Sequence, residues 1–101
     1  MKKLIILYKE PADVDEFLRH YRETHLPLVK RIPGLIGTAL TRVDRTMLGE
    51  PGNFLLAELH FVDAESFKAA MKSDENHQVG ADLARFAEGI ATVMTGETLD
   101  G

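Results

Sequence analysis

Cysteine and tryptophan are absent from the 101 residues of this chain. Without cysteine there can be no disulfide, no thiolate metal ligand and no cysteine nucleophile. The absence fits a reducing compartment, and we expect a cytoplasmic location. The opening MKKLIILY has two lysines and a brief apolar run. It lacks the longer apolar region and the small-residue cleavage site of a signal peptide.

Long apolar segments and basic runs are missing as well. No segment approaches the ~20 apolar residues that a membrane-spanning helix needs, so no membrane partner is expected. Twelve Lys and Arg face 16 Asp and Glu, which gives a net charge of −4. With no basic cluster and few aromatic residues, the chain lacks the footprint of a nucleic-acid-binding protein. A hydrophobic content of 45% supports one domain over residues 1–101.

The first half of the chain predicts a strand, a helix and a second strand. Residues 3–9 form an apolar run that fills both alternating sets, which is typical of a strand covered on both faces. Asp13 and Glu16 form a capping box at the start of a helix. Apolar residues then recur at steps of three and four up to Ile32, and Pro33-Gly34 ends the helix. Residues 35–43 alternate as a strand should.

The second half predicts two more strands and more helix. A loop at 44–53 leads to a strand at 54–62, and a short helix at 64–72 is capped by Asp63. Residues 73–76 interrupt that helix, and a second helical piece precedes a strand at 90–95. The order β-α-β-β-α-β predicts an α+β, ferredoxin-like domain: a four-stranded antiparallel sheet with the helices on one face.

The same pattern predicts a homodimer. Two helical segments cover only one face of the sheet, yet the first three predicted strands carry apolar residues on both faces. The remaining face needs a cover, and a second copy related by two-fold symmetry can supply it. Burial at ~25 cal/mol per Å² would favour this association before its entropic cost is counted.

His25 stands out because it lies in line with the apolar residues of the first helix, two positions before Pro27. A proline inside a helix removes one donor and frees the carbonyl of Glu23, so the helix must kink or restart there. Two interpretations remain open. The imidazole is either a core histidine that stabilises the kinked helix, or it faces a cleft and takes part in acid–base chemistry or ligand binding.

Other polar residues share predicted faces with one another. Tyr21 lies one helical turn before His25, and Tyr8 ends the first strand on a face that its alternation leaves undecided. Either tyrosine alone is most simply a core aromatic residue with a solvated hydroxyl.

On the third predicted strand, Glu58 and His60 share one face, and Arg42 on the second strand matches that face. They form either a ligand site or salt bridges, with Arg42 or across a dimer. His20 and His77 are expected at the surface. Because no close ligand pair, phosphate loop or nucleotide-binding motif is present, we expect neither a metal nor a cofactor.

The first strand, ending in Tyr8-Lys9, and the segment FLRHYRETHLPLVKRIPGL together resemble the EthD family. That family belongs to the dimeric α/β-barrel superfamily of ferredoxin-like domains, and the order of elements matches over essentially the whole chain. The resemblance implies a homodimer whose two sheets close a barrel, with His25 as the family's helix-one histidine. The family's namesake is associated with degradation of an alkyl ether. Wider relatives include cofactor-free monooxygenases, lactone isomerases, aromatic cyclases, dehydratases and haem enzymes, so the fold does not choose a reaction.

We therefore expect a small, mostly apolar cavity on the His25 side of the sheet, which binds a small organic metabolite. Its predicted wall consists of Tyr8, Tyr21, His25, Arg42, Glu58 and His60. In an enzyme, His25 would transfer the proton, and Tyr21 or Tyr8 would orient the ligand. The reaction would be an isomerisation, dehydration, cyclisation or cofactor-free oxygenation in a degradative pathway. A non-catalytic binding or accessory role beside an oxidative system is the alternative, and a purely structural dimer is the third possibility.

Overall fold

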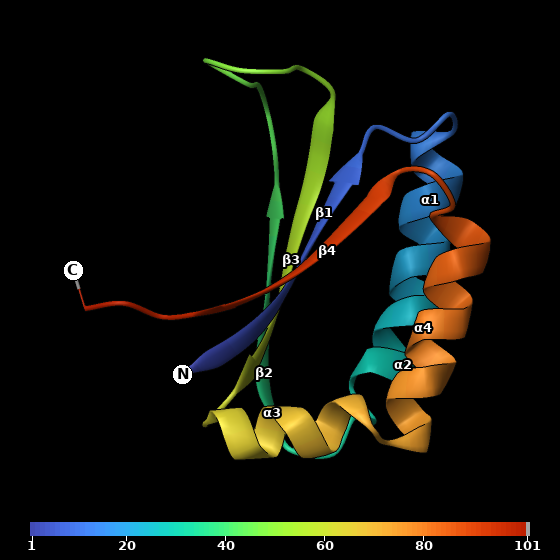
Figure 1. The fold of residues 1–101 in the computed structure, drawn as a ribbon. Helices are drawn as coiled ribbons and strands as arrows, with labels where there is room; N and C mark the ends of the chain where they lie inside the picture. Colours follow the sequence, from blue (N-terminus) through green and yellow to red (C-terminus); the bar gives the residue numbers. More distant parts are fainter. Residues whose placement is uncertain (101) are drawn as a thin grey trace.

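The computed structural model describes residues 1–100, and its four strands form one antiparallel sheet in the order β2-β3-β1-β4. The helices α1, α2 and α4 lie on one side of this sheet, and α3 lies across its lower end (Figure 1). This is the predicted α+β, ferredoxin-like arrangement. The elements are β1 (Lys2–Lys9), α1 (Val14–His20), η1 (Tyr21–His25), α2 (Leu26–Val29), β2 (Leu35–Arg42), β3 (Asn53–Phe61), α3 (Ala64–Met71), α4 (Asp74–Phe86) and β4 (Ala91–Glu97).

β1 lies at the centre of the sheet, paired with β3 on one side and β4 on the other. Ile6 lies opposite Ala57 of β3 and Val93 of β4. Successive side chains of a strand point to opposite faces, so Tyr8 shares the face of Ile6. Both are buried, at 1% and 5% exposure, against the helical layer. The structure therefore settles the face of Tyr8, which alternation alone left open.

Side-chain caps start three of the helices where the sequence predicts caps or turns. Asp13 accepts a hydrogen bond from the backbone N–H of Glu16, and Asp63 accepts one from Ser66. Ser73, placed in the predicted interruption, caps α4 by accepting from the N–H of Asn76. Each bond satisfies a backbone donor that has no partner inside the helix. The interruption is thus two residues, Lys72 and Ser73, and α4 begins at Asp74.

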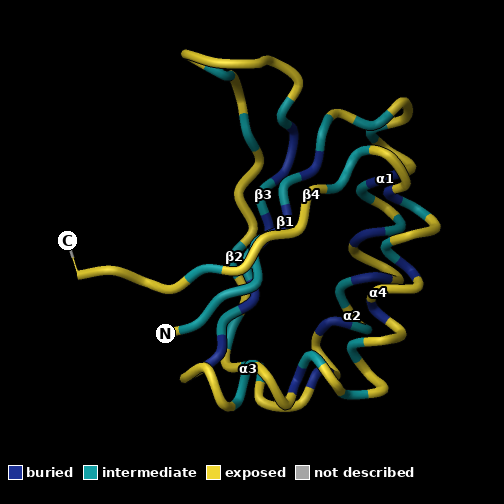
Figure 2. The backbone as a smooth tube through the Cα atoms, in the orientation of Figure 1, coloured by how far each residue is buried: buried dark blue, intermediate teal, exposed yellow. Residues whose placement is uncertain are grey.

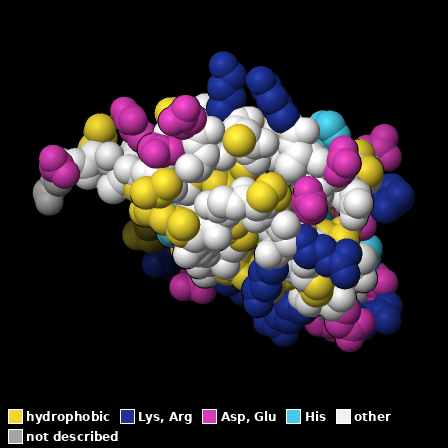
Figure 3. Space-filling model, turned by 90° about the horizontal axis from the view of Figure 1, so that it is seen from below, with side chains coloured by type: hydrophobic (Ala, Val, Ile, Leu, Met, Phe, Trp, Pro, Cys, Tyr) yellow, Lys and Arg dark blue, Asp and Glu magenta, His cyan; other side chains and the backbone are white. Residues whose placement is uncertain are grey.

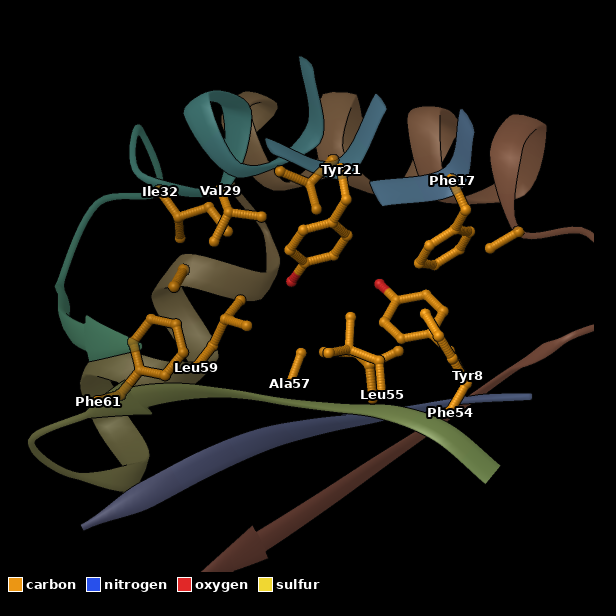
Figure 4. Packing of buried hydrophobic residues seen from close by; sticks show 14 residues of the cluster. Tyr8, Phe17, Tyr21, Val29, Ile32, Phe54, Leu55, Ala57, Leu59 and Phe61 are labelled. Carbon is orange, nitrogen blue, oxygen red and sulfur yellow. The ribbon is translucent and has the colours of Figure 1, made fainter. Parts of the chain in front are cut away.

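The core fills the space between the sheet and the helices, where the inner faces of both layers are buried (Figure 2). Phe17 of α1 packs edge-on against Tyr8 at 5.3 Å and against Phe54 at 5.7 Å between ring centroids. Figure 4 shows these rings between the helices and the strands, beside the aliphatic residues of β3. Edge-to-face pairs of this kind stabilise a core beyond the area they bury.

The first helical segment is interrupted at the predicted place, just before Pro27. Residues Tyr21–His25 form a π-helical turn, which closes with a hydrogen bond from the Leu26 N–H to the Tyr21 carbonyl. Pro27 then occupies the first turn of α2, where a missing N–H has no cost. A turn of this kind accommodates the proline by inserting one extra residue, and such turns are frequent at functional sites.

The other face of the sheet carries none of the helices of residues 1–100 (Figure 1). Ile5, Leu7 and Leu56 lie on it half-buried, and Met94 is 41% exposed. In the space-filling view of Figure 3, hydrophobic side chains are visible toward the left, the side of this open face. No helix of the described chain is long and apolar enough to cross a bilayer.

Candidate functional site

A cavity of about 250 Å³ lies between the sheet and the helices, and most of its wall is apolar. Leu4, Ile6, Val29, Leu59, Met71, Val79, Leu83 and Val93 supply the apolar part. Tyr8, Tyr21, His25 and Asn76 supply the polar groups. Val93 on β4 is 49% exposed and Gly80 on α4 is exposed, so the mouth lies between these two elements.

His25 is held by Asp82, a buried carboxylate on α4. The His25 Nδ1 and Asp82 Oδ2 atoms are 2.9 Å apart, and the two residues are only 3% and 1% exposed. Burial acts against the charge of Asp82, but hydrogen bonds from His20 and His25 outweigh it and hold the pKa of Asp82 below its usual range. An ionised carboxylate only accepts, so Nδ1 of His25 carries the hydrogen and Nε2 keeps its lone pair.

Burial also keeps the imidazole neutral. It lowers the pKa of His25, and the opposing pull of Asp82 does not fully compensate. No hydrogen bond among residues 1–100 engages Nε2, yet none of their buried side-chain nitrogen or oxygen atoms lacks a partner. Nε2 therefore reaches open space, and the cavity is the space that His25 lines. The result is a neutral base directed into a mostly apolar chamber.

The two tyrosine hydroxyls face the same space. The Tyr8 and Tyr21 rings lie 5.9 Å apart at 86°, and Figure 4 shows both hydroxyls in the space between the helices and the sheet. Neither hydroxyl has a hydrogen-bond partner among residues 1–100. Because none of the buried side-chain oxygen atoms of these residues lacks a partner, both hydroxyls reach open space. Burial raises the pKa of Tyr21 to about 12 and raises the pKa of Tyr8 further. Both phenols thus remain protonated donors near neutral pH.

The π-helical turn brings Tyr21 and His25 together, because they are its first and last residues. Their ring centroids are 5.3 Å apart. Phe86 of α4 packs against His25, with 4.7 Å between ring centroids, and lies 6.3 Å from the Tyr21 ring. The local sequence that makes room for Pro27 therefore also places two polar groups at one wall of the cavity.

His20 is not the solvated surface residue that the sequence predicts. Its Nε2 lies 2.9 Å and 3.0 Å from the two carboxylate oxygens of Asp82, and its ring packs 4.7 Å from Phe86. The side chain is 31% exposed, and it lines a separate surface groove beside Glu16 and Glu88. Asp82 thus joins a histidine at the cavity to a histidine at the surface. His77 is exposed, as predicted.

Three residues of the predicted wall lie elsewhere. Glu58 and His60 point to the open face of the sheet, where Glu58 pairs with Lys3 at 2.7 Å and with His60 at 3.2 Å. Arg42 lies opposite Leu55, on the helical side of the sheet, with its guanidinium 5.1 Å from the centroid of the Phe54 ring. The expectation that all six residues share one wall is corrected: Tyr8, Tyr21 and His25 line the cavity, whereas Arg42 lines a separate pocket beside Tyr21, and Glu58 and His60 lie on the open face.

Asp82 is the residue that sequence reasoning missed. The signal was present, because Asp82 follows Val79 by three positions and precedes Phe86 by four, which places it on the apolar face of α4. A carboxylate on a buried face needs partners. A search for such a partner would have led to His25, the imidazole on the apolar face of the first helix.

The strand order and the one-sided helical layer define a ferredoxin-like α+β domain, with a histidine and two tyrosines at its cavity. The sequence matches the EthD domain over residues 9–90, and the chain belongs to the EthD family. A crystal structure of an ethyl tert-butyl ether d (EthD) family protein from Bacillus halodurans is 40% identical, with a TM-score of 0.91, and the match covers 98% of this chain and 99% of that one.

Two further comparisons extend this result. An uncharacterized 11.0 kDa protein from the thcB-thcC intergenic region of Rhodococcus erythropolis is 34% identical over 94 residues, which is 93% of this chain and 91% of that protein. A dimeric protein of unknown function with a ferredoxin-like fold, from Bacteroides fragilis, shares the fold at a TM-score of 0.61 and 20% identity. That match covers 96% of this chain and 95% of the other.

Proposed function

We propose that this protein is a cytoplasmic homodimer that binds a small organic metabolite in the His25 cavity and transfers protons on it, as one step of a degradative pathway. The observation that carries the proposal is the hydrogen bond between His25 and Asp82, which leaves Nε2 free at an apolar cavity. Isomerisation, dehydration, cyclisation and cofactor-free oxygenation of a carbon acid all begin with removal of a proton. Because burial lowers the pKa of His25, its imidazole is neutral and able to accept that proton near neutral pH.

Asp82 supports such chemistry by orienting the ring and by stabilising the charge that forms. When Nε2 takes a proton, the imidazolium ion remains hydrogen-bonded through Nδ1 to the carboxylate, 2.9 Å away. The same division of labour operates in catalytic triads, where the carboxylate fixes the tautomer and stabilises the imidazolium. Tyr21 and Tyr8 would orient the ligand or polarise one of its oxygens. No cofactor is part of this proposal.

The open face of the sheet supports the homodimer. Ile5, Leu7, Leu56 and Met94 offer apolar surface there that no helix of residues 1–100 covers. Lys3, with Glu58 and His60, forms a charge-compensated cluster on the same face, so a partner would meet paired charges. The Bacteroides fragilis relative, which is dimeric, adds a precedent on this fold.

A ligand-capture experiment with His25→Gln tests the proposal. We would identify small molecules that copurify with the protein by mass spectrometry, and then follow their conversion. His77→Gln is the matched control, because His77 is an exposed histidine on α4 that touches neither Asp82 nor the cavity. Loss of a general base should slow turnover by about 10²- to 10⁴-fold, with folding intact.

Three outcomes separate the candidate roles. Slow turnover in His25→Gln, with normal turnover in His77→Gln, supports proton transfer. Binding without turnover, in the wild type and in both variants, supports the accessory role beside an oxidative system. A lower unfolding temperature in His25→Gln, with no change in the binding of any ligand, shows that the imidazole only stabilises the helix at Pro27.

A further inference from the structure

The wall of the cavity excludes charged ligands. Among the described residues, none of the lysine, arginine, aspartate or glutamate side chains lines it. Asp82 lies behind His25 and already accepts hydrogen bonds from two histidines. A carboxylate or phosphate inside this chamber would lose its hydration and meet no lysine or arginine, and its only cationic partner would be a protonated His25, whose charge burial disfavours. The lining of this site therefore favours a neutral ligand.

The polar groups of the cavity define two complementary subsites. Tyr8 and Tyr21 both line the cavity and supply two hydroxyl donors to it (Figure 4). An oxygen atom with two lone pairs can accept from two such donors. The Nε2 atom of His25 is an acceptor, and its ring lies 5.3 Å from that of Tyr21. A ligand that satisfies both subsites carries an oxygen that accepts hydrogen bonds and, close to it, a hydrogen that can leave as a proton.

We infer that the cavity takes a neutral ketone, held at its oxygen by Tyr8 and Tyr21, with an acidic C–H group beside Nε2 of His25. This assignment rests on the proposed function, because it names the substrate class of the same site. A cavity of about 250 Å³ is smaller than the ~300 Å³ at which pockets for drug-sized ligands begin. It suits a compact ketone with one ring or a short branched chain.

The proton transfer balances without a further reactant. The C–H bond beside the carbonyl breaks, and its proton forms a bond to Nε2 of His25. The electron pair left on carbon forms a C=C bond, and the carbonyl π pair moves to oxygen to give an enolate. The hydroxyls of Tyr8 and Tyr21 donate to that oxygen as its charge grows, as in an oxyanion hole. Return of a proton from His25 to carbon completes an isomerisation or a hydrogen exchange.

Three probes of similar shape test the assignment: acetophenone as the ketone, ethylbenzene without the oxygen, and benzoate as the anion. We would measure binding of each by chemical-shift titration of the full-length protein. Acetophenone should bind more tightly than ethylbenzene, and Tyr8→Phe and Tyr21→Phe should each weaken it by about 2- to 10-fold, as expected for one lost hydrogen bond. Neither variant should change ethylbenzene binding, which controls for a distorted cavity.

Two binding results would overturn the assignment: benzoate that binds as tightly as acetophenone, or ethylbenzene that binds as tightly as the ketone. Exchange of the acetophenone methyl protons in D₂O then tests the proton transfer separately. Exchange that is fast in the wild type and in His77→Gln, but slow in His25→Gln, supports the complete step. A preference for the ketone with no exchange supports the substrate class and counts against proton transfer as the function.

Discussion

Replacement of Asp82 by asparagine removes a buried charge and nearly preserves the shape of the side chain. Asp82 is 1% exposed and accepts hydrogen bonds from His25 at 2.9 Å and from His20 at 2.9 Å and 3.0 Å. Hydrogen bonds to charged groups contribute about 1.5–3 kcal/mol each. The bond from His25 is buried and counts fully, whereas His20 is about a third exposed and its bonds count less. We expect Asp82→Asn to lose about 2–4 kcal/mol of unfolding free energy.

Thermal and urea unfolding at pH 7 measure this loss. For a domain of this size, each kcal/mol shifts Tm by roughly 4–8 °C, so Tm should fall by about 8–32 °C. Glu88→Gln is the control, because Glu88 is exposed and lies in the same groove as His20 without a hydrogen bond to it in residues 1–100. We expect a change within about 0.5 kcal/mol for Glu88→Gln.

Nitrogen NMR of the imidazole gives a second readout that a purely structural role would not move. In the wild type, His25 should be neutral, with hydrogen on Nδ1 and a free Nε2. Because the Asp82 carboxylate raises the pKa of His25 against the effect of burial, Asp82→Asn should lower that pKa further and mix the two tautomers. An unchanged tautomer together with a Tm within a few degrees of the wild type would refute the role assigned to Asp82.

Three further outcomes follow from the structure. Because the pKa of His25 is lowered in the folded protein, the unfolded chain binds its proton at a higher pH than the folded protein does. The free energy of unfolding should therefore fall as pH drops below about 6.5. His25→Gln should reduce this pH dependence in urea titrations between about pH 5 and 7.5. Leu56→Lys places a charge on the open sheet face, and sedimentation should show monomers where the wild type is dimeric; a wild-type monomer at micromolar concentration would remove the dimer proposal. Gly80→Ala should stabilise the protein by about 0.5–1 kcal/mol in the same unfolding assay, because a Cβ there meets nothing within 4 Å and alanine favours a helix interior.

Local sequence signals predicted most of the fold. The capping residues Asp13, Asp63 and Ser73 mark helix starts or the break between helices, and alternation located the strands within one or two residues. These signals are short-range, so a sequence reader can find them. The position of His25 on the buried face, and the break before Pro27, belong to the same class.

These short-range signals do not determine the register between strands. Simple alternation places Arg42 on the face of Glu58, but a bulge between Leu35 and Gly37 inserts one residue into β2. Every later residue of β2 therefore changes face, and Arg42 lies opposite Leu55. The pairing of His25 with Asp82 was equally hidden, because 57 residues separate the two and only packing of the first helix against α4 unites them.

The extra residue of the π-helical turn sets the rotation of the preceding helix, α1, about its own axis. An α-helix rotates by about 100° per residue. If one residue between Tyr21 and His25 were deleted, the turn would regularise, and α1 would swing by roughly that angle about its own axis. Phe17 would leave the aromatic cluster and the Tyr21 hydroxyl would leave the chamber, while His25 stayed beside Asp82. The length of this turn therefore sets the rotation of α1 relative to α2, and with it the direction of the Phe17 and Tyr21 side chains.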